Sequence, residues 1–187
     1  MPTYSQPIQL GSTAPEFSLP GVDGRTYRLS DFQGAKALVI AFICNHCPYV
    51  IATQGRMNRL ASEFAEQGVK WLGINANDAQ KYPDDSFEQM KARALEQGFV
   101  FPYLRDETQE VARAYGAACT PEFYVYTPRE GRWVLEYQGR LDDHWKDESA
   151  VTRQELREAL ECIVSGKLPS PDQKPAIGCS IKWKSAV

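Results

Sequence analysis

The sequence of 187 residues contains only two histidines and five cysteines, and it has no apolar run long enough to cross a membrane. Five cysteines are few, and odd in number, for a secreted domain held by disulfides, so we expect a reducing, cytoplasmic setting. A net charge of −3 gives no electrostatic reason to expect nucleic acid or an anionic membrane as a partner. Internal repeats, low-complexity tracts and the basic and apolar regions of a signal peptide are also missing.

We expect the chain to be organised around residues 37–50, ALVIAFICNHCPYV. Residues 37–43 are all apolar, which is typical of a strand buried on both faces. Cys44 and Cys47 follow, and Pro48 fits the first turn of a helix. Free backbone N–H groups and the positive end of the helix dipole favour a thiolate there. The sequence therefore predicts a buried strand that delivers a dithiol to a helix N-terminus.

A CxxC pair near a βαβ pattern is typical of redox chemistry, because the two sulfurs can close a small disulfide across one helical turn. We expect Cys44 to be the nucleophile, with its pKa lowered to about 3.5–7.5, and Cys47 to resolve the mixed disulfide. A protonated His46 would stabilise the thiolate. Half of a zinc site and an inert structural pair are the alternatives. Zinc usually needs a second CxxC or a paired histidine, and the other histidine, His144, stands alone.

The remaining pattern alternates strands and helices and then closes with an antiparallel hairpin. Strands are expected at 69–75, 123–126 and 133–137, and helices at 48–67, 86–98, 108–116 and 152–165, with a short apolar stretch at 100–104. Alternation followed by an antiparallel pair indicates a mixed sheet with helices on both faces. Turn residues at 21–24 predict a further hairpin before the sheet. The sequence therefore predicts an α/β fold with an N-terminal β-hairpin extension.

Two of these helices have candidate caps in the sequence. Asp84, Asp85 and Ser86 can each cap the helix that precedes Gly98. Thr152 and Glu155 have the spacing of a capping box.

The last twenty residues are expected to be a tail. We expect one domain over 1–167 and a segment over 168–187 that docks on it, since a solvated tail seldom contains a tryptophan such as Trp183. Cys179 in this tail would have a high effective concentration at any site the tail reaches. It could resolve an oxidised active-site cysteine or pair with Cys119, or it could be an idle thiol on a structural tail.

A strand that ends in CxxC at a helix start, followed much later by a residue–Pro step that opens a β-hairpin, resembles the thioredoxin superfamily. More narrowly, four motifs together resemble its bacterial peroxiredoxin-like group: FICNHCPYV, ACTPEFYVY, QGRLDD and the terminal GCSIKWK. The opening GSTAPEFSLPGVDGRTYRLSDFQG is similar to that of the peroxiredoxin and TlpA-like branch. The resemblance extends over nearly the whole chain and implies a thioredoxin-like fold. It also implies that Thr120-Pro121 is a cis step beside the dithiol, where it presents backbone to the substrate and shields the thiols from metals.

The sequence departs from the peroxiredoxin pattern at the cysteines. Peroxiredoxins carry Pro and Thr or Ser seven and three residues before the peroxidatic cysteine. Counting back from Cys47 gives Ile40 and Cys44, and counting back from Cys44 gives Ala37 and Ala41. The usual peroxide pocket is therefore not expected, which favours dithiol exchange over peroxide reduction.

These observations predict a thiol–disulfide oxidoreductase that acts on protein or small-molecule disulfides and is served by a thioredoxin-type reductant, without a metal or organic cofactor. His46 directly before the second cysteine resembles the oxidising and isomerising members of the superfamily. A different class of function remains open, namely a zinc or redox sensor in which Cys44, Cys47, Cys119 and Cys179 converge. The oligomeric state is not predicted.

Peroxidase activity is the alternative within the same class. Either Cys44 or Cys47 would be oxidised to a sulfenic acid and then condensed to a disulfide. Arg105 or Arg140 would polarise the peroxide.

Overall fold

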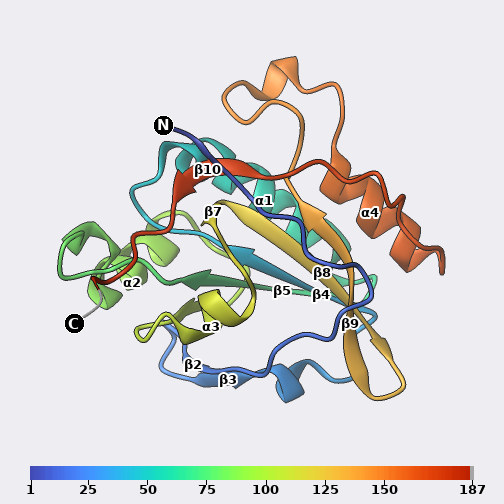
Figure 1. Ribbon diagram of the computed structural model, residues 1–187, viewed down its shortest axis with the longest axis horizontal. Coiled ribbons are helices and arrows are strands. Elements are labelled where there is room, and N and C mark those ends of the chain that lie inside the picture. The colour runs from blue at the N-terminus through green and yellow to red at the C-terminus, as the bar shows by residue number, and fades with distance from the viewer. Residues whose placement is uncertain (186–187) are drawn as a thin grey trace.

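The computed structural model describes residues 1–185 and is built on a five-stranded sheet (Figure 1). The strand order is β6 (Tyr103–Arg105), β5 (Val69–Asn75), β4 (Ala37–Phe42), β8 (Glu122–Arg129) and β9 (Arg132–Gly139). Strands β4, β5 and β6 are parallel, whereas β8 and β9 run antiparallel. The predicted mixed sheet is thus confirmed, with the buried strand β4 at its centre.

Both faces of the sheet are covered, which explains the unbroken apolar run in β4. The helices are α1 (Pro48–Ala65), α2 (Phe87–Glu96), α3 (Glu110–Ala114) and α4 (Glu155–Val164). Val39 packs with residues of α1, α2 and α4 on one face, and Leu38 packs with α3 and the N-terminal segment on the other. Each fully buried aliphatic side chain of this kind contributes about 1.5–3 kcal/mol. Among the described residues, the helices are too short or too polar to cross a bilayer.

The N-terminal hairpin consists of β2 (Ser18–Pro20) and β3 (Thr26–Arg28), paired antiparallel as predicted. Leu19 of this hairpin packs in the same hydrophobic core as Leu38 of the central strand β4. Three 3-10 turns complete the elements, η1 (Leu29–Phe32), η2 (Pro83–Asp85) and η3 (Glu148–Ala150).

The two ends of the chain meet in a second, three-stranded sheet of order β1-β10-β7 (Figure 1). Its strands are β1 (Thr3–Tyr4), β10 (Ile177–Ser180) and β7 (Cys119–Thr120), all antiparallel. Ile181 is buried, and the Trp183 ring lies 4.4 Å from the Arg113 guanidinium. Residues 177–183 of the predicted tail therefore pack on the body of the protein, whereas residues 186–187 lie outside the described part of the chain.

One of the two predicted helix caps is confirmed and the other is wrong. Ser86 caps α2, with Oγ accepting a hydrogen bond from Gln89 N at 3.4 Å. Helix α4 begins only at Glu155, whose side chain binds Arg140 instead of reaching back to the chain before the helix. Thr152 accepts no capping bond, and its N–H and hydroxyl both bind Asp143. The predicted capping box is therefore wrong. The side chains of Thr152 and Glu155 bind Asp143 and Arg140 instead, so neither of them caps the helix.

Candidate active site

The dithiol lies between the end of β4 and the start of α1. Cys47 is the N-cap residue of α1 and Pro48 is its first helical residue, as the sequence predicts. Both sulfurs are covered, since Cys44 is 2 % exposed and Cys47 is 0 % exposed. All five cysteines of the chain are free thiols in this structure.

The Thr120-Pro121 peptide bond is cis, and Thr120 contacts both thiols. Cys44 Sγ lies 3.3 Å from Thr120 Oγ1, and Cys47 Sγ lies 3.2 Å from the Thr120 carbonyl oxygen. The predicted position of this step beside the dithiol is confirmed. Its role in substrate binding stays a prediction.

The two cysteines share one proton unequally. A hydrogen bond from Cys44 lowers the pKa of Cys47 to about 5, and the Val50 backbone N–H at the start of α1 adds to this, against the opposing effect of burial. The same bond to Cys47, then burial, then the charge of Asp85 raise the pKa of Cys44. The expectation of a lowered pKa at Cys44 is therefore wrong. Helix α1 begins after the second cysteine, so its N-terminus stabilises negative charge on Cys47.

Removing the Cys44 thiol is expected to raise the pKa of Cys47, because the hydrogen bond from Cys44 is the largest cause of its lowering. Cys44→Ser keeps a hydroxyl donor and Cys44→Ala does not, so the alanine variant should titrate about one pH unit higher than the serine variant. Ultraviolet thiolate absorbance measures this. In the parent, the thiolate should persist at neutral pH and disappear as the pH falls through about 5. Equal midpoints in the two variants would contradict the assignment.

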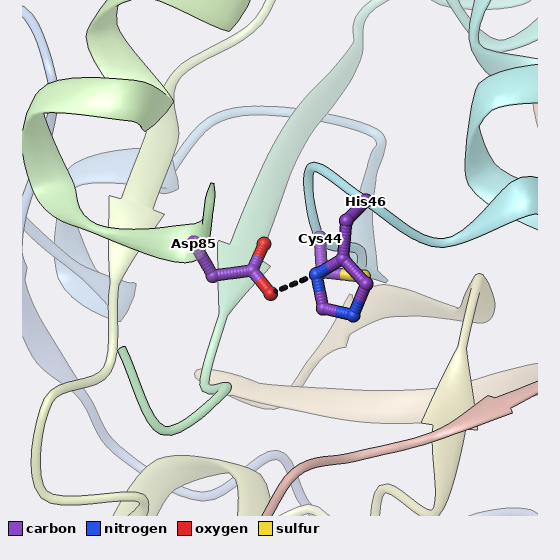
Figure 2. Close-up of side chains that lie close together, drawn as sticks. All are labelled: Cys44, His46 and Asp85. Atoms are coloured by element: carbon purple, nitrogen blue, oxygen red, sulfur yellow. Dashed lines mark ion pairs between the residues drawn. The ribbon is translucent and has the colours of Figure 1, made fainter. Parts of the chain in front are cut away.

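His46 precedes Cys47 in the sequence, and its ring faces the carboxylate of Asp85 beside Cys44 (Figure 2). Its Nδ1 is 2.6 Å from Asp85 Oδ2, and its ring stacks on Tyr82 with centroids 5.6 Å apart. The imidazole keeps 27 % of its surface exposed, whereas the Asp85 side chain is fully buried. The carboxylate and the Tyr82 ring together fix the orientation of the imidazole beside the dithiol.

Asp85 is the centre of a buried polar network. Its Oδ1 accepts hydrogen bonds from Asn45 N at 2.7 Å and Asn75 Nδ2 at 3.1 Å. Its Oδ2 accepts one from Asn77 Nδ2 at 2.8 Å. These donors compensate the burial of the carboxylate and tie the Cys44–Cys47 loop to the end of β5.

Sequence reasoning missed this network, since it treated Asp85 only as a candidate helix cap. A signal was nonetheless present. Asn75 ends β5 and Asn77 follows it, while Cys44 follows the parallel strand β4. Polar residues after neighbouring parallel strands lie at one edge of the sheet, where sites of α/β proteins form.

Cys44, His46 and Asp85 are also the one group in residues 1–185 with metal-ligand geometry, their ligand atoms lying within 4.8 Å of one another. The alternative zinc site made of four cysteines is not formed. A sulfur, a nitrogen and an oxygen would suit a transition metal. Asp85, however, already accepts hydrogen bonds from neighbouring amides on both oxygens, so its burial needs no ion.

The other cysteines with predicted roles lie near the dithiol. Cys179 on β10 pairs with Thr120 across the strands, and its side chain interacts with Cys47. Cys119 is fully buried, with Sγ 3.9 Å from Glu122 Oε2, and burial raises its pKa. Within residues 1–185, the one side-chain hydrogen-bond partner of the Cys119 thiol is the Glu122 carboxylate, which favours the neutral thiol.

The two arginines considered for peroxide binding have other partners. Arg105 donates to the backbone oxygens of Asn77 at 2.8 Å and Asp85 at 3.4 Å. Arg140 pairs with Glu155. Arg105 therefore supports the loop that carries Asp85, and the structure gives neither arginine a contact with a thiol.

Comparisons with known proteins identify the family of the chain. The sequence profile of the AhpC/TSA family matches residues 10–143, which include the dithiol and Thr120-Pro121. The chain belongs to the AhpC/TSA family. At the level of this family, the prediction of a redoxin with a thioredoxin-like fold is confirmed.

The curated proteins that are similar to this chain include a thiol-disulfide oxidoreductase and a peroxiredoxin. The chain is 30 % identical to the thiol-disulfide oxidoreductase ResA of Geobacillus thermodenitrificans over 66 % of each chain. It is also 30 % identical to peroxiredoxin Bcp of Escherichia coli, over 59 % of this chain and 65 % of Bcp. The chain thus spans slightly less than two thirds of either relative.

A solved structure matches the whole chain. It is the crystal structure of an uncharacterized conserved protein from Geobacillus kaustophilus, 45 % identical in sequence. The TM-score is 0.93, and the match covers 100 % of this chain and 98 % of that one. The β1-β10-β7 sheet lies within the matched region.

Proposed function

We propose that this protein is a thiol–disulfide oxidoreductase in which Cys47 is the attacking thiolate and Cys44 is the resolving thiol. The observation that carries the proposal is Cys47 at the N-cap of α1, where the helix N-terminus stabilises a thiolate, with Thr120 in contact with both thiols. This exchanges the roles expected from the sequence. Substrates are disulfides, from proteins or small molecules, and Thr120-Pro121 presents backbone to them.

In the proposed reaction, Cys47 Sγ attacks one sulfur of a substrate disulfide, and the other sulfur leaves as a thiolate. Cys44 then gives up its proton and attacks Cys47 Sγ. The Cys44–Cys47 disulfide forms, the second substrate thiol leaves, and two electrons have passed to the substrate. A ligand nitrogen of His46 lies within 4.8 Å of Cys44 Sγ, which makes His46 the candidate acceptor of the Cys44 proton.

Thiol peroxidase activity is the second candidate. A covered sulfur such as that of Cys47 is reached more easily by a small hydroperoxide than by a protein disulfide. The thiolate would attack the peroxide to give a sulfenic acid and an alcohol, and Cys44 would condense with it, releasing water. Ile40 and Cys44 stand where peroxiredoxins have Pro and Thr or Ser, and this ranks the peroxidase second.

A side-by-side assay of insulin reduction, with glutathione as the reductant, and of hydroperoxide consumption, coupled to thioredoxin and its reductase, tests the proposal. We expect insulin reduction by the parent and a loss of at least about 100-fold in Cys47→Ser, because the nucleophile is removed. Cys162→Ser is the matched control, since Cys162 lies on α4 and should leave the rate unchanged. Consumption of hydroperoxide alone would favour the peroxidase. Inactivity of the parent in both assays would contradict an oxidoreductase of either kind.

A further inference from the structure

Strand β10 covers the dithiol and is fixed on both sides. Thr3 and Tyr4 of β1 pair with one of its edges, and Cys119 and Thr120 of β7 pair with the other. The chain after β10 is held as well, since Ile181 N donates to the Ala118 carbonyl at 3.1 Å. Helix α1 also contacts β10. An external thiol or disulfide therefore meets β10 before it meets Cys47.

Cys179 is the member of β10 that touches the dithiol. It lies opposite Thr120 in the register, and the Thr120 carbonyl oxygen is 3.2 Å from Cys47 Sγ. The Cys179 side chain packs against the buried cluster that contains Cys44 and Cys47, and its thiol lowers the pKa of Cys47. Cys179 is only half-buried, whereas Cys44 and Cys47 are buried. Of the three neighbouring thiols, Cys179 is the one that solvent reaches.

We propose that Cys179 is the third thiol of the redox centre and the point at which external thiols re-reduce the buried dithiol. This rests on the proposed function, because it needs an oxidised Cys44–Cys47 pair. Cys179 is thereby assigned a specific step, the return of electrons to the centre, rather than attack on the substrate.

The proposed re-reduction of the Cys44–Cys47 disulfide needs no reactant other than two external thiols. The Cys179 thiolate attacks Cys47 Sγ, the Cys47–Cys179 bond forms, and Cys44 leaves and takes up the proton that Cys179 lost. An external thiolate then attacks Cys179 Sγ and Cys47 leaves as a thiolate. A second external thiol attacks the external sulfur of that mixed disulfide and frees Cys179. In sum, two external thiols become a disulfide, and the Cys44–Cys47 dithiol is restored.

The charge on Cys47 determines when Cys179 is reactive. In the reduced protein, burial and then the Cys47 thiolate raise the pKa of Cys179 to about 12, so Cys179 is a poor nucleophile. Oxidation of Cys47 removes its negative charge, while Lys182 continues to favour the Cys179 thiolate. Cys47 is also a good leaving group, because thiolates of low pKa leave faster. The low pKa of Cys47 therefore favours the second step, in which the external thiol attacks Cys179 and Cys47 leaves.

The first test is a disulfide map of Cys44→Ser, in which Cys47 keeps Cys179 as a neighbour. Diamide, a thiol oxidant, should produce an intramolecular Cys47–Cys179 disulfide at low protein concentration, because β10 holds the two sulfurs together. Cys162→Ser in the same background should give the same bond. Absence of the Cys47–Cys179 peptide would overturn the proposal.

The second test measures how fast dithiothreitol reduces the oxidised protein. We expect Cys179→Ser to be reduced at least about tenfold more slowly than the parent, since the exposed sulfur is lost. The unfolding midpoint of Cys179→Ser, compared with that of Cys162→Ser, shows whether β10 stays docked. A parental or faster rate would mean that β10 is only a cover. If the parent forms no Cys44–Cys47 disulfide at all, the proposed function fails instead, so the two failures are distinguishable.

Discussion

Replacing Asp85 by alanine should lower the free energy of unfolding by about 3–5 kcal/mol, because a buried charge and all its hydrogen bonds are lost together. Asn45 N, Asn75 Nδ2 and Asn77 Nδ2 would each remain buried without the carboxylate they bind. An unsatisfied buried donor costs about 1–3 kcal/mol. His46 would lose its partner at the same time, so the loop carrying the dithiol should loosen.

Urea unfolding of Asp85→Ala measures this cost, with Asp84→Ala as the matched control. The Asp84 side chain is exposed and makes no contact in the structure that depends on its carboxylate, so its removal should cost less than about 0.5 kcal/mol. The redox potential of the dithiol, measured against glutathione in the same two variants, reports on the orientation of His46. A similar stability for both variants would show that the network contributes little.

Replacing Gly178 by alanine should separate β10 from Thr120 and open the dithiol. A Cβ at residue 178 would lie 1.9 Å from the Thr120 carbonyl oxygen and 2.6 Å from its carbonyl carbon. Both are backbone atoms, so rotation of a side chain cannot relieve the overlap. The strand must move away, and Cys47, which is 0 % exposed in the parent, should then become accessible.

The rate of Cys47 alkylation by iodoacetamide measures the opening, and we expect an increase of about tenfold or more because the thiolate is already formed at neutral pH. Gly55→Ala is the control, since a Cβ on this exposed helical residue meets only Arg59 Nη1 at 3.7 Å. That substitution should leave the alkylation rate unchanged. Equal rates in the two variants would show that β10 does not limit access to Cys47.

The elements set by local pattern could be predicted from the sequence. The apolar run at 37–43 and Pro48 mark the junction between β4 and α1, and Val69–Asn75 was predicted with both of its ends. Cys44, Cys47 and the Thr120-Pro121 step needed only their residue types and a family resemblance. In each case the signal lies within a few neighbouring residues.

The rest depends on partners far apart in the chain. Asp85 contacts Asn45 across forty positions, so its neighbours suggested a helix cap and nothing more. Likewise, the pKa order of the two thiols depends on where α1 starts and on the charge of Asp85 near Cys44. Four-residue β10 has no periodic pattern of its own. It forms a strand because it pairs with β1 along one edge and with β7 along the other.

Because Thr3 pairs with Gly178, the sheet that contains β1 can form only after β10 has been synthesised. During synthesis, the Cys44–Cys47 loop, α1 and β7 all leave the ribosome before β10 does. A nascent chain therefore carries an uncovered dithiol until residues 177–180 have emerged. The sulfurs are closed off only when β10 has paired with β1 and β7.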